Sequence, residues 1–151
     1  MKKIRITLFS LFLAAPLLAQ TKTLVNVDRN GVALQGYDPV AFFTDHKPVK
    51  GKMEFKSVYH GGTYYFASAE AKADFDKDPA KFEPEFGGFC AFGVSHNKLA
   101  KIDPEAFQIV DGHLMLQYSK SVQTEFNKDT QGNLTRARAN WSGLVEKQGK
   151  P

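Results

Sequence analysis

The sequence lacks most of the features that mark specialised classes of protein. Its 151 residues include one cysteine, seven prolines and twelve glycines, with 42% hydrophobic and 24% charged positions. A single cysteine excludes an intramolecular disulfide scaffold, and ordinary glycine and proline usage excludes collagen-like and disordered chains. Length and composition therefore predict one folded domain built around one hydrophobic core.

Long apolar runs are also absent, except at the N-terminus. Residues 1–19 carry three basic residues, then a short apolar stretch, then Ala19, which is the pattern of a secretory signal peptide. We expect export to the periplasm or outside the cell, a mature domain over residues 20–151, and no membrane span after cleavage. Leu17 is an unusual residue three positions before the cut, so an uncleaved anchor is the alternative.

The chain has little excess charge once this leader is set aside. Removing its three basic residues lowers the formal net charge from +4 to +1, because 17 basic residues then face 16 acidic ones. The remaining charges are interspersed, and Arg136 and Arg138 form only a small basic cluster. We therefore expect no nucleic-acid partner.

Turn residues predict two β-hairpins. The first surrounds Gly61-Gly62 and the second surrounds Asp111-Gly112, both of which suit two-residue loops with positive φ. The expected strands cover residues 54–60, 63–67, 107–110 and 113–118. In the second hairpin, this register pairs Ile109 with Leu114 and Phe107 with Leu116.

Helix starts are predicted by two kinds of signal. An Asp-Pro-x-x-Phe pattern begins at Asp38, Asp78 and Asp103, and Ser68 and Ser119 are each placed to cap a helix after a hairpin. A last helix is expected over residues 130–146. The predicted class is α+β, with two hairpin-plus-helix units forming a small antiparallel sheet covered by helices.

Several of these segments together resemble one known family, the YHS domain. They are GYDPVAFF at residues 36–43, YHGGTYYFAS at 59–68 and DPAKF at 78–82, and the resemblance continues through GGFCA at 87–91. Over about residues 24–142, the chain is similar to a longer, exported form of this family. The resemblance implies the family's fold and a relation to heavy-metal trafficking and sensing modules.

The chain departs from the family where short YHS domains carry thiolates for soft metals. Those positions are occupied here by Ala41, Ala67 and Ala71. We therefore expect the family's fold without its thiolate site.

Three other residues are candidate metal ligands, for copper, zinc or nickel. Cys90 lies in a segment rich in glycine and phenylalanine, His60 adjoins the first hairpin turn, and His96 follows Cys90 by six residues. The alternative is that Cys90 is a small buried hydrophobe and both histidines are solvated. Tyr37 and Asp38 form a further candidate locus, although a helix cap would also explain Asp38.

Two functions remain open from the sequence. The first is an exported, non-catalytic module that binds or senses a transition-metal ion or a small ligand. The second is a structural or protein-interaction domain of the cell envelope that has lost the metal thiolates. No nucleophile motif or phosphate-binding glycine loop points to an enzyme.

Overall fold

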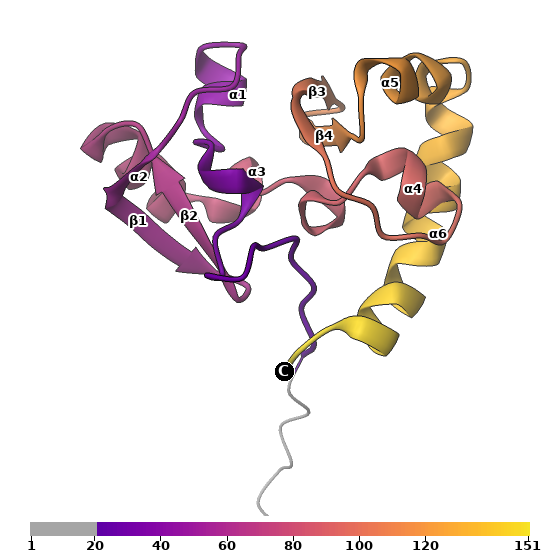
Figure 1. Ribbon diagram of the computed structural model, residues 1–151, viewed down its shortest axis with the longest axis horizontal. Helices are drawn as coiled ribbons and strands as arrows, with labels where there is room; N and C mark the ends of the chain where they lie inside the picture. Colours follow the sequence, from indigo (N-terminus) through magenta and orange to yellow (C-terminus); the bar gives the residue numbers. More distant parts are fainter. Residues whose placement is uncertain (1–20) are drawn as a thin grey trace, which may run out of the picture.

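The computed structural model describes residues 21–151, so the predicted signal peptide at residues 1–19 lies outside the described part of the chain. Two units of helices and strands lie side by side, and the long helix α6 runs along the flank of the second unit (Figure 1). The elements, in chain order, are η1 (Leu34–Gly36), α1 (Ala41–Thr44), β1 (Lys52–Tyr59), β2 (Gly62–Phe66), α2 (Ala69–Lys77), α3 (Pro79–Phe82), η2 (Glu85–Gly88), α4 (Ala91–Ser95), β3 (Asp103–Val110), β4 (His113–Gln117), α5 (Lys120–Asn127) and α6 (Thr130–Gln148).

The predicted α+β class is confirmed. Within residues 21–151, each hairpin forms its own two-stranded antiparallel sheet, so the strands make two sheets instead of one. The second hairpin has the predicted register, with Ile109 opposite Leu114 and Phe107 opposite Leu116. Both serine caps are confirmed, since Ser68 accepts from the backbone N–H of Ala71 and Ser119 from that of Val122.

The turn of the first hairpin differs from the prediction by one residue. Tyr59 pairs with Gly62, so the two turn residues are His60 and Gly61, both with positive φ. Gly62 lies in the strand, where a Cβ atom would approach Val25 Cγ1 to 2.9 Å. The second glycine is therefore explained by the close packing of the N-terminal segment, and not by the turn.

The predicted helix start at Asp103 is wrong. Asp103 begins strand β3 and pairs with Gln117 on β4. Its carboxylate accepts from the backbone N–H of Glu105 at 3.0 Å, which is a local turn and not the start of a helix. Cross-strand pairing with β4 outweighs the helix signal of the Asp-Pro pair. At Asp78 the helix α3 does begin as predicted, with Pro79 at its first position.

The hydrophobic interior consists of two clusters, where the composition had predicted one core. Strand β4 lies between them, because its alternate side chains point to opposite faces. Leu114 and Leu116 belong to the first cluster and Met115 to the second. Phe42, Tyr64, Phe66 and Phe75 fill the first cluster, and Phe86, Phe126, Leu134 and Leu144 fill the second.

The described ends of the chain meet at the lower end of α6 (Figure 1). Thr23 and Lys150 exchange two backbone hydrogen bonds of 2.8 Å each, in an antiparallel bridge. This pairing holds the N-terminal segment alongside α6. No helix within residues 21–151 is both long enough and apolar enough to span a bilayer.

Candidate functional site

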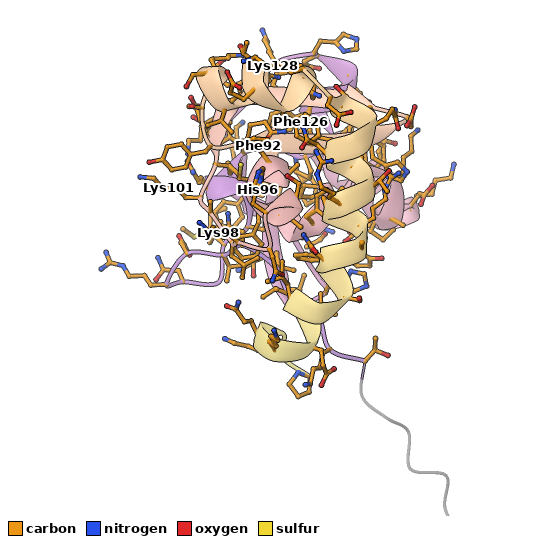
Figure 2. All side chains as sticks on the ribbon, turned by 90° about the vertical axis from the view of Figure 1, so that its right-hand side faces the viewer. Phe92, His96, Lys98, Lys101, Phe126 and Lys128 are labelled. Atoms are coloured by element: carbon orange, nitrogen blue, oxygen red, sulfur yellow. The ribbon has the colours of Figure 1, made fainter. Side chains whose placement is uncertain are left out.

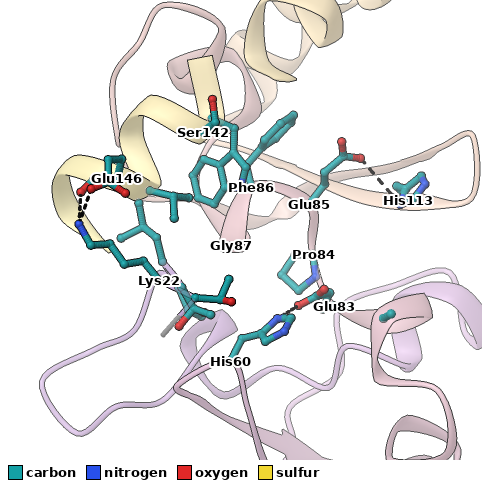
Figure 3. Close-up of a pocket in the computed structure, with 17 residues that line it drawn as sticks. Lys22, His60, Glu83, Pro84, Glu85, Phe86, Gly87, His113, Ser142 and Glu146 are labelled. Carbon is teal, nitrogen blue, oxygen red and sulfur yellow. Dashed lines mark hydrogen bonds and ion pairs between the residues drawn. The ribbon is translucent and has the colours of Figure 1, made fainter. Parts of the chain in front are cut away.

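A groove of about 870 Å³ opens between the first hairpin turn, the segment around Pro84 and the last turns of α6 (Figure 3). This volume is within the range of small-molecule sites, roughly 300–1,000 Å³. The N-terminal segment forms one wall with Lys22, Leu24 and Val25, and α6 forms another with Trp141 and Val145. Segments far apart in the sequence therefore build the groove together.

His60 reaches the rim of the groove from the β1–β2 turn. Its Nδ1 lies 3.0 Å from Glu83 Oε2, and its ring stacks on Tyr59 with centroids 3.9 Å apart. An ionised carboxylate can only accept, so Nδ1–H donates and Nε2 remains available to another partner. Burial raises the pKa of Glu83 above its usual range, and the hydrogen bond and charge of His60 partly offset this.

Glu85 also lines the groove and lies beside two further basic groups, Arg138 and His113. Its carboxylate accepts from Arg138 Nε at 2.9 Å and lies 3.8 Å from His113 Nδ1. The pKa of Arg138 is raised by this hydrogen bond. Pro84 separates Glu83 from Glu85, and the two carboxylates therefore engage different parts of the molecule (Figure 3).

Apolar and aromatic side chains form much of the groove wall. Phe86 and Trp141 meet edge to face, with ring centroids 5.9 Å apart. Leu24, Val25 and Val145 lie around them on the groove wall. Such a wall can bury the apolar body of a ligand, while the histidine–glutamate pairs offer polar contacts at the edge.

Cys90 lies elsewhere, with only 1% of its surface exposed. Its sulfur accepts from the backbone N–H groups of Gly93 at 3.4 Å and Tyr118 at 3.3 Å, and its thiol donates to Gln117 Oε1 at 3.4 Å. The residue caps the N-terminal end of α4 and packs in the first hydrophobic cluster. This arrangement agrees with the structural alternative for the thiol.

His96 ends α4, beside Phe92 and Lys98 (Figure 2). Its Nδ1 lies 2.9 Å from the carbonyl oxygen of Phe92 and 3.0 Å from Ser95 Oγ. These contacts fix the ring against its own helix. Neither His96 nor Cys90 contributes to the groove that His60 lines.

Asp38 is buried, at 1% exposure, and both of its carboxylate oxygens hold backbone groups. Oδ1 accepts from Val40 and Oδ2 from Ala67, each at 2.8 Å. Burial raises the pKa of Asp38, although these N–H groups act in the opposite direction. Asp38 thus ties the start of α1 to the end of β2, in the region where short YHS domains carry thiolates.

Tyr37 packs at the edge of the first cluster, with Lys50 Nζ 4.1 Å above the centre of its ring. This is a cation–π contact between paired backbone segments, since Tyr37 and Lys50 also form a β-bridge. Across residues 21–151, no three histidine, cysteine or acidic side chains come together in a way that could hold a metal ion.

Comparison with known proteins identifies one domain. The family model of the YHS domain matches residues 40–85. The chain contains a YHS domain. No curated protein and no solved structure matches the chain significantly.

The YHS match runs from the start of α1 to Glu85. It therefore includes His60, Glu83 and Glu85 on one side of the groove. Lys22 and Trp141, on the other side, lie outside the matched residues. The groove forms where the YHS domain meets the N-terminal segment and α6.

The sequence predicted His60 as a metal ligand with Cys90 and His96, whereas the structure places it on the groove without either of them. The other groove residues were not predicted as site residues. Lys22, the pair Glu83 and Glu85, and Trp141 are separated by long stretches of chain and share no motif. The Glu-Pro-Glu triplet beside the glycine-rich segment, and the only tryptophan of the chain, were the available signals.

Proposed function

We propose that the protein is an exported, non-catalytic YHS module that binds a small ligand in the groove between its YHS domain and α6. The groove of about 870 Å³, with an aromatic wall and His60 at its rim, carries this proposal. The N-terminal leader pattern supports export. N-terminal sequencing of the protein from a periplasmic fraction should give Gln20 as the first residue.

The groove is a better candidate than Cys90 because it is open to solvent. The thiol is enclosed by protein donors and acceptors, so a metal or ligand would have to displace several contacts to reach it. His60 has 45% of its side chain exposed and is held in place by Glu83. We therefore place ligand binding at His60, without a role for Cys90 or His96.

A structural or protein-interaction domain is the second candidate function. It is favoured by the hydrogen bonds of Asp38 and Cys90, whose polar side-chain atoms bind backbone and side-chain groups inside the protein. In that case the groove would bind no small molecule, and the test below would show this.

The only tryptophan of the chain makes the groove directly observable. We would screen small apolar and amphiphilic compounds, together with Cu(II), Zn(II) and Ni(II), against mature protein without a histidine tag, and follow Trp141 fluorescence and thermal stability. A bound ligand should change Trp141 emission and raise the melting temperature in a saturable way.

Two matched substitutions on α6 locate the binding. Ser142 lines the groove and is exposed, whereas Ala139 is exposed on the same helix away from it. Ser142→Arg should abolish binding by filling the groove, and Ala139→Arg should leave it unchanged. Equal effects of the two variants, or no saturable binding by any compound, would contradict the proposal.

A further inference from the structure

We infer that the ligand of this groove is an apolar alcohol, an uncharged compound with a hydrocarbon body and a hydroxyl group. This inference rests on the proposed function, because it assigns a chemical class to the ligand of the same groove. Three observations carry it. The charged side chains of the groove are already paired, the wall between them is apolar, and His60 presents a hydrogen-bond acceptor.

The acidic and basic side chains of the groove neutralise one another. Within residues 21–151, each of those that line it contacts a partner of the opposite kind. The contacts join Lys22 to Glu146 at 2.7 Å, His60 to Glu83 at 3.0 Å, and Glu85 to Arg138 at 2.9 Å and to His113 at 3.8 Å. A charged ligand would lose water without meeting a free countercharge, or would have to break one of these contacts, so the groove favours an uncharged ligand.

The wall of the groove offers apolar surface for the body of such a ligand. Leu24 and Val25 on the N-terminal segment, and Trp141 and Val145 on α6, line the groove and are only partly buried. Their exposed carbon atoms would leave water when a hydrocarbon body binds against them, which is the favourable term in such binding. The apolar part of the ligand therefore lies between the N-terminal segment and α6.

His60 adds one polar contact of defined direction. Its Nδ1–H donates to the carboxylate of Glu83, so the lone pair of the neutral imidazole lies on Nε2 (Figure 3). Within residues 21–151, no group is hydrogen-bonded to Nε2, and 45% of the His60 side chain is exposed. A hydroxyl group can donate to Nε2, whereas a ketone or an ether has no hydrogen to donate. Glu83 thus selects a donor ligand by fixing the tautomer of His60.

Compounds that share a cyclohexane ring provide a matched test: cyclohexanol, cyclohexanone, cyclohexylamine and cyclohexanecarboxylate. Each is titrated into isotope-labelled mature protein at about pH 8, above the ordinary titration range of an imidazole. The indole N–H signal of Trp141, the only tryptophan, reports binding. Cyclohexanol should bind about threefold to tenfold more tightly than the ketone, and at least about tenfold more tightly than either charged compound. Added salt should leave the affinity of the alcohol unchanged.

Two substitutions test the acceptor. His60→Asn removes the imidazole at a turn position whose positive φ asparagine tolerates, and should lower the affinity for the alcohol to that for the ketone. Glu83→Gln can donate to Nδ1, which releases the other tautomer of His60, and should also abolish the preference for the alcohol. Glu54→Gln, at an exposed position on β1, is the control and should leave every affinity as it was.

Equal affinity for the alcohol and the ketone, or tighter binding of either charged compound, would overturn the alcohol class but leave the groove as a binding site. A preference that survives both substitutions would overturn the role of His60. If none of the compounds moves the Trp141 signal, the inference is overturned, and the compound screen with Ser142→Arg decides separately whether the groove binds other ligands.

Discussion

The thiol of Cys90 sits at the N-terminal end of α4, where it satisfies two backbone N–H groups. Cys90→Ala would leave both donors and Gln117 without this partner, and should lower the free energy of unfolding by about 1–3 kcal/mol. Cys90→Ser keeps an acceptor at the cap and should lower it less, because serine is among the preferred capping residues. Urea unfolding of the two variants measures the difference.

The same burial predicts how the thiol reacts. A thiol reagent should modify Cys90 slowly in the native protein and rapidly in denaturant, because only 1% of the residue is exposed. The chain has no other cysteine to obscure the result. Rapid labelling of the native protein would show that the enclosing contacts open easily and would reopen the case for a reactive thiol.

The raised pKa of Glu83 predicts how the free energy of unfolding changes with pH. Its folded-state pKa is raised above the ordinary 4.5, so the native state binds this proton more tightly than the unfolded chain does. The contribution to stability is complete below the ordinary pKa and is lost as pH rises through the raised one. The unfolding free energy should therefore fall, relative to that of Glu83→Gln, as the pH rises above the ordinary value of 4.5.

His60 supplies the control for that measurement. Burial is the largest cause of the raised pKa of Glu83, and the pair with His60 acts against it. In the His60→Ala variant, the fall in unfolding free energy with rising pH, measured against the double variant with Glu83→Gln, should be larger. A relative stability that increases with pH would mean that the ion pair outweighs burial.

At the scale of the element, η2 depends on a close backbone approach. Gly87 has a φ of +59°, and its carbonyl accepts from Asn26 N–H at 2.8 Å. A Cβ atom at this position would collide with the backbone oxygen of Leu24. Gly87→Ala should lower the free energy of unfolding by about 2–4 kcal/mol and loosen the N-terminal wall of the groove.

Gly112→Ala is the matched control for this prediction. Gly112 also has a positive φ, +80°, but no atom lies within 4 Å of the Cβ position. Its substitution should lower the unfolding free energy by only about 1–2 kcal/mol, from backbone strain alone. Equal losses in urea unfolding would show that the contact with Leu24 adjusts without strain.

The elements show which sequence signals are sufficient. Ser68 and Ser119 predicted their helices correctly because a cap bonds to the chain three residues away. The helix predicted at Asp103 was wrong because Asp103 pairs with Gln117 on β4, and a local pattern does not contain such a long-range contact. Gly62 was wrongly predicted as a turn residue. A glycine is needed there because a Cβ atom would clash with Val25, which lies far away in the sequence.

At the scale of the whole molecule, β4 joins the two hydrophobic clusters. Leu116 packs in the first cluster, and Trp141 reports on the second. Leu116→Ala should lower the free energy of unfolding by about 2–5 kcal/mol. Because one strand serves both clusters, the Trp141 fluorescence transition and the circular dichroism transition should shift together in urea.

Separate shifts would identify two independent folding units. A Trp141 transition that stays at its original midpoint, while the circular dichroism midpoint falls, would mean that the second cluster does not need the first. Val58→Ala, at a strongly exposed position on β1, should move neither transition.

The candidate site could be predicted only in part, because most of its residues come together through long-range packing. His60 was predicted as a metal ligand because it adjoins a recognisable turn, and the structure places it on the groove instead of beside Cys90 and His96. Cys90 and His96 are close in sequence, yet each is committed to contacts with its own helix or neighbouring strand. Glu83, Trp141 and Lys22 meet only through the packing of α6 against the N-terminal segment, which no local pattern encodes.

The bridge between Thr23 and Lys150 also determines how the molecule responds to mechanical force. Because the pairing is antiparallel, both flanking ends of the chain leave it on the same side. A force that pulls these ends apart first loads the ion pair between Lys22 and Glu146, and then acts on the two hydrogen bonds one after the other, as in a zipper. The edge of the groove formed by Lys22 would therefore open first, before the force reaches Leu24 and Val25, which pack against the second and the first hydrophobic cluster.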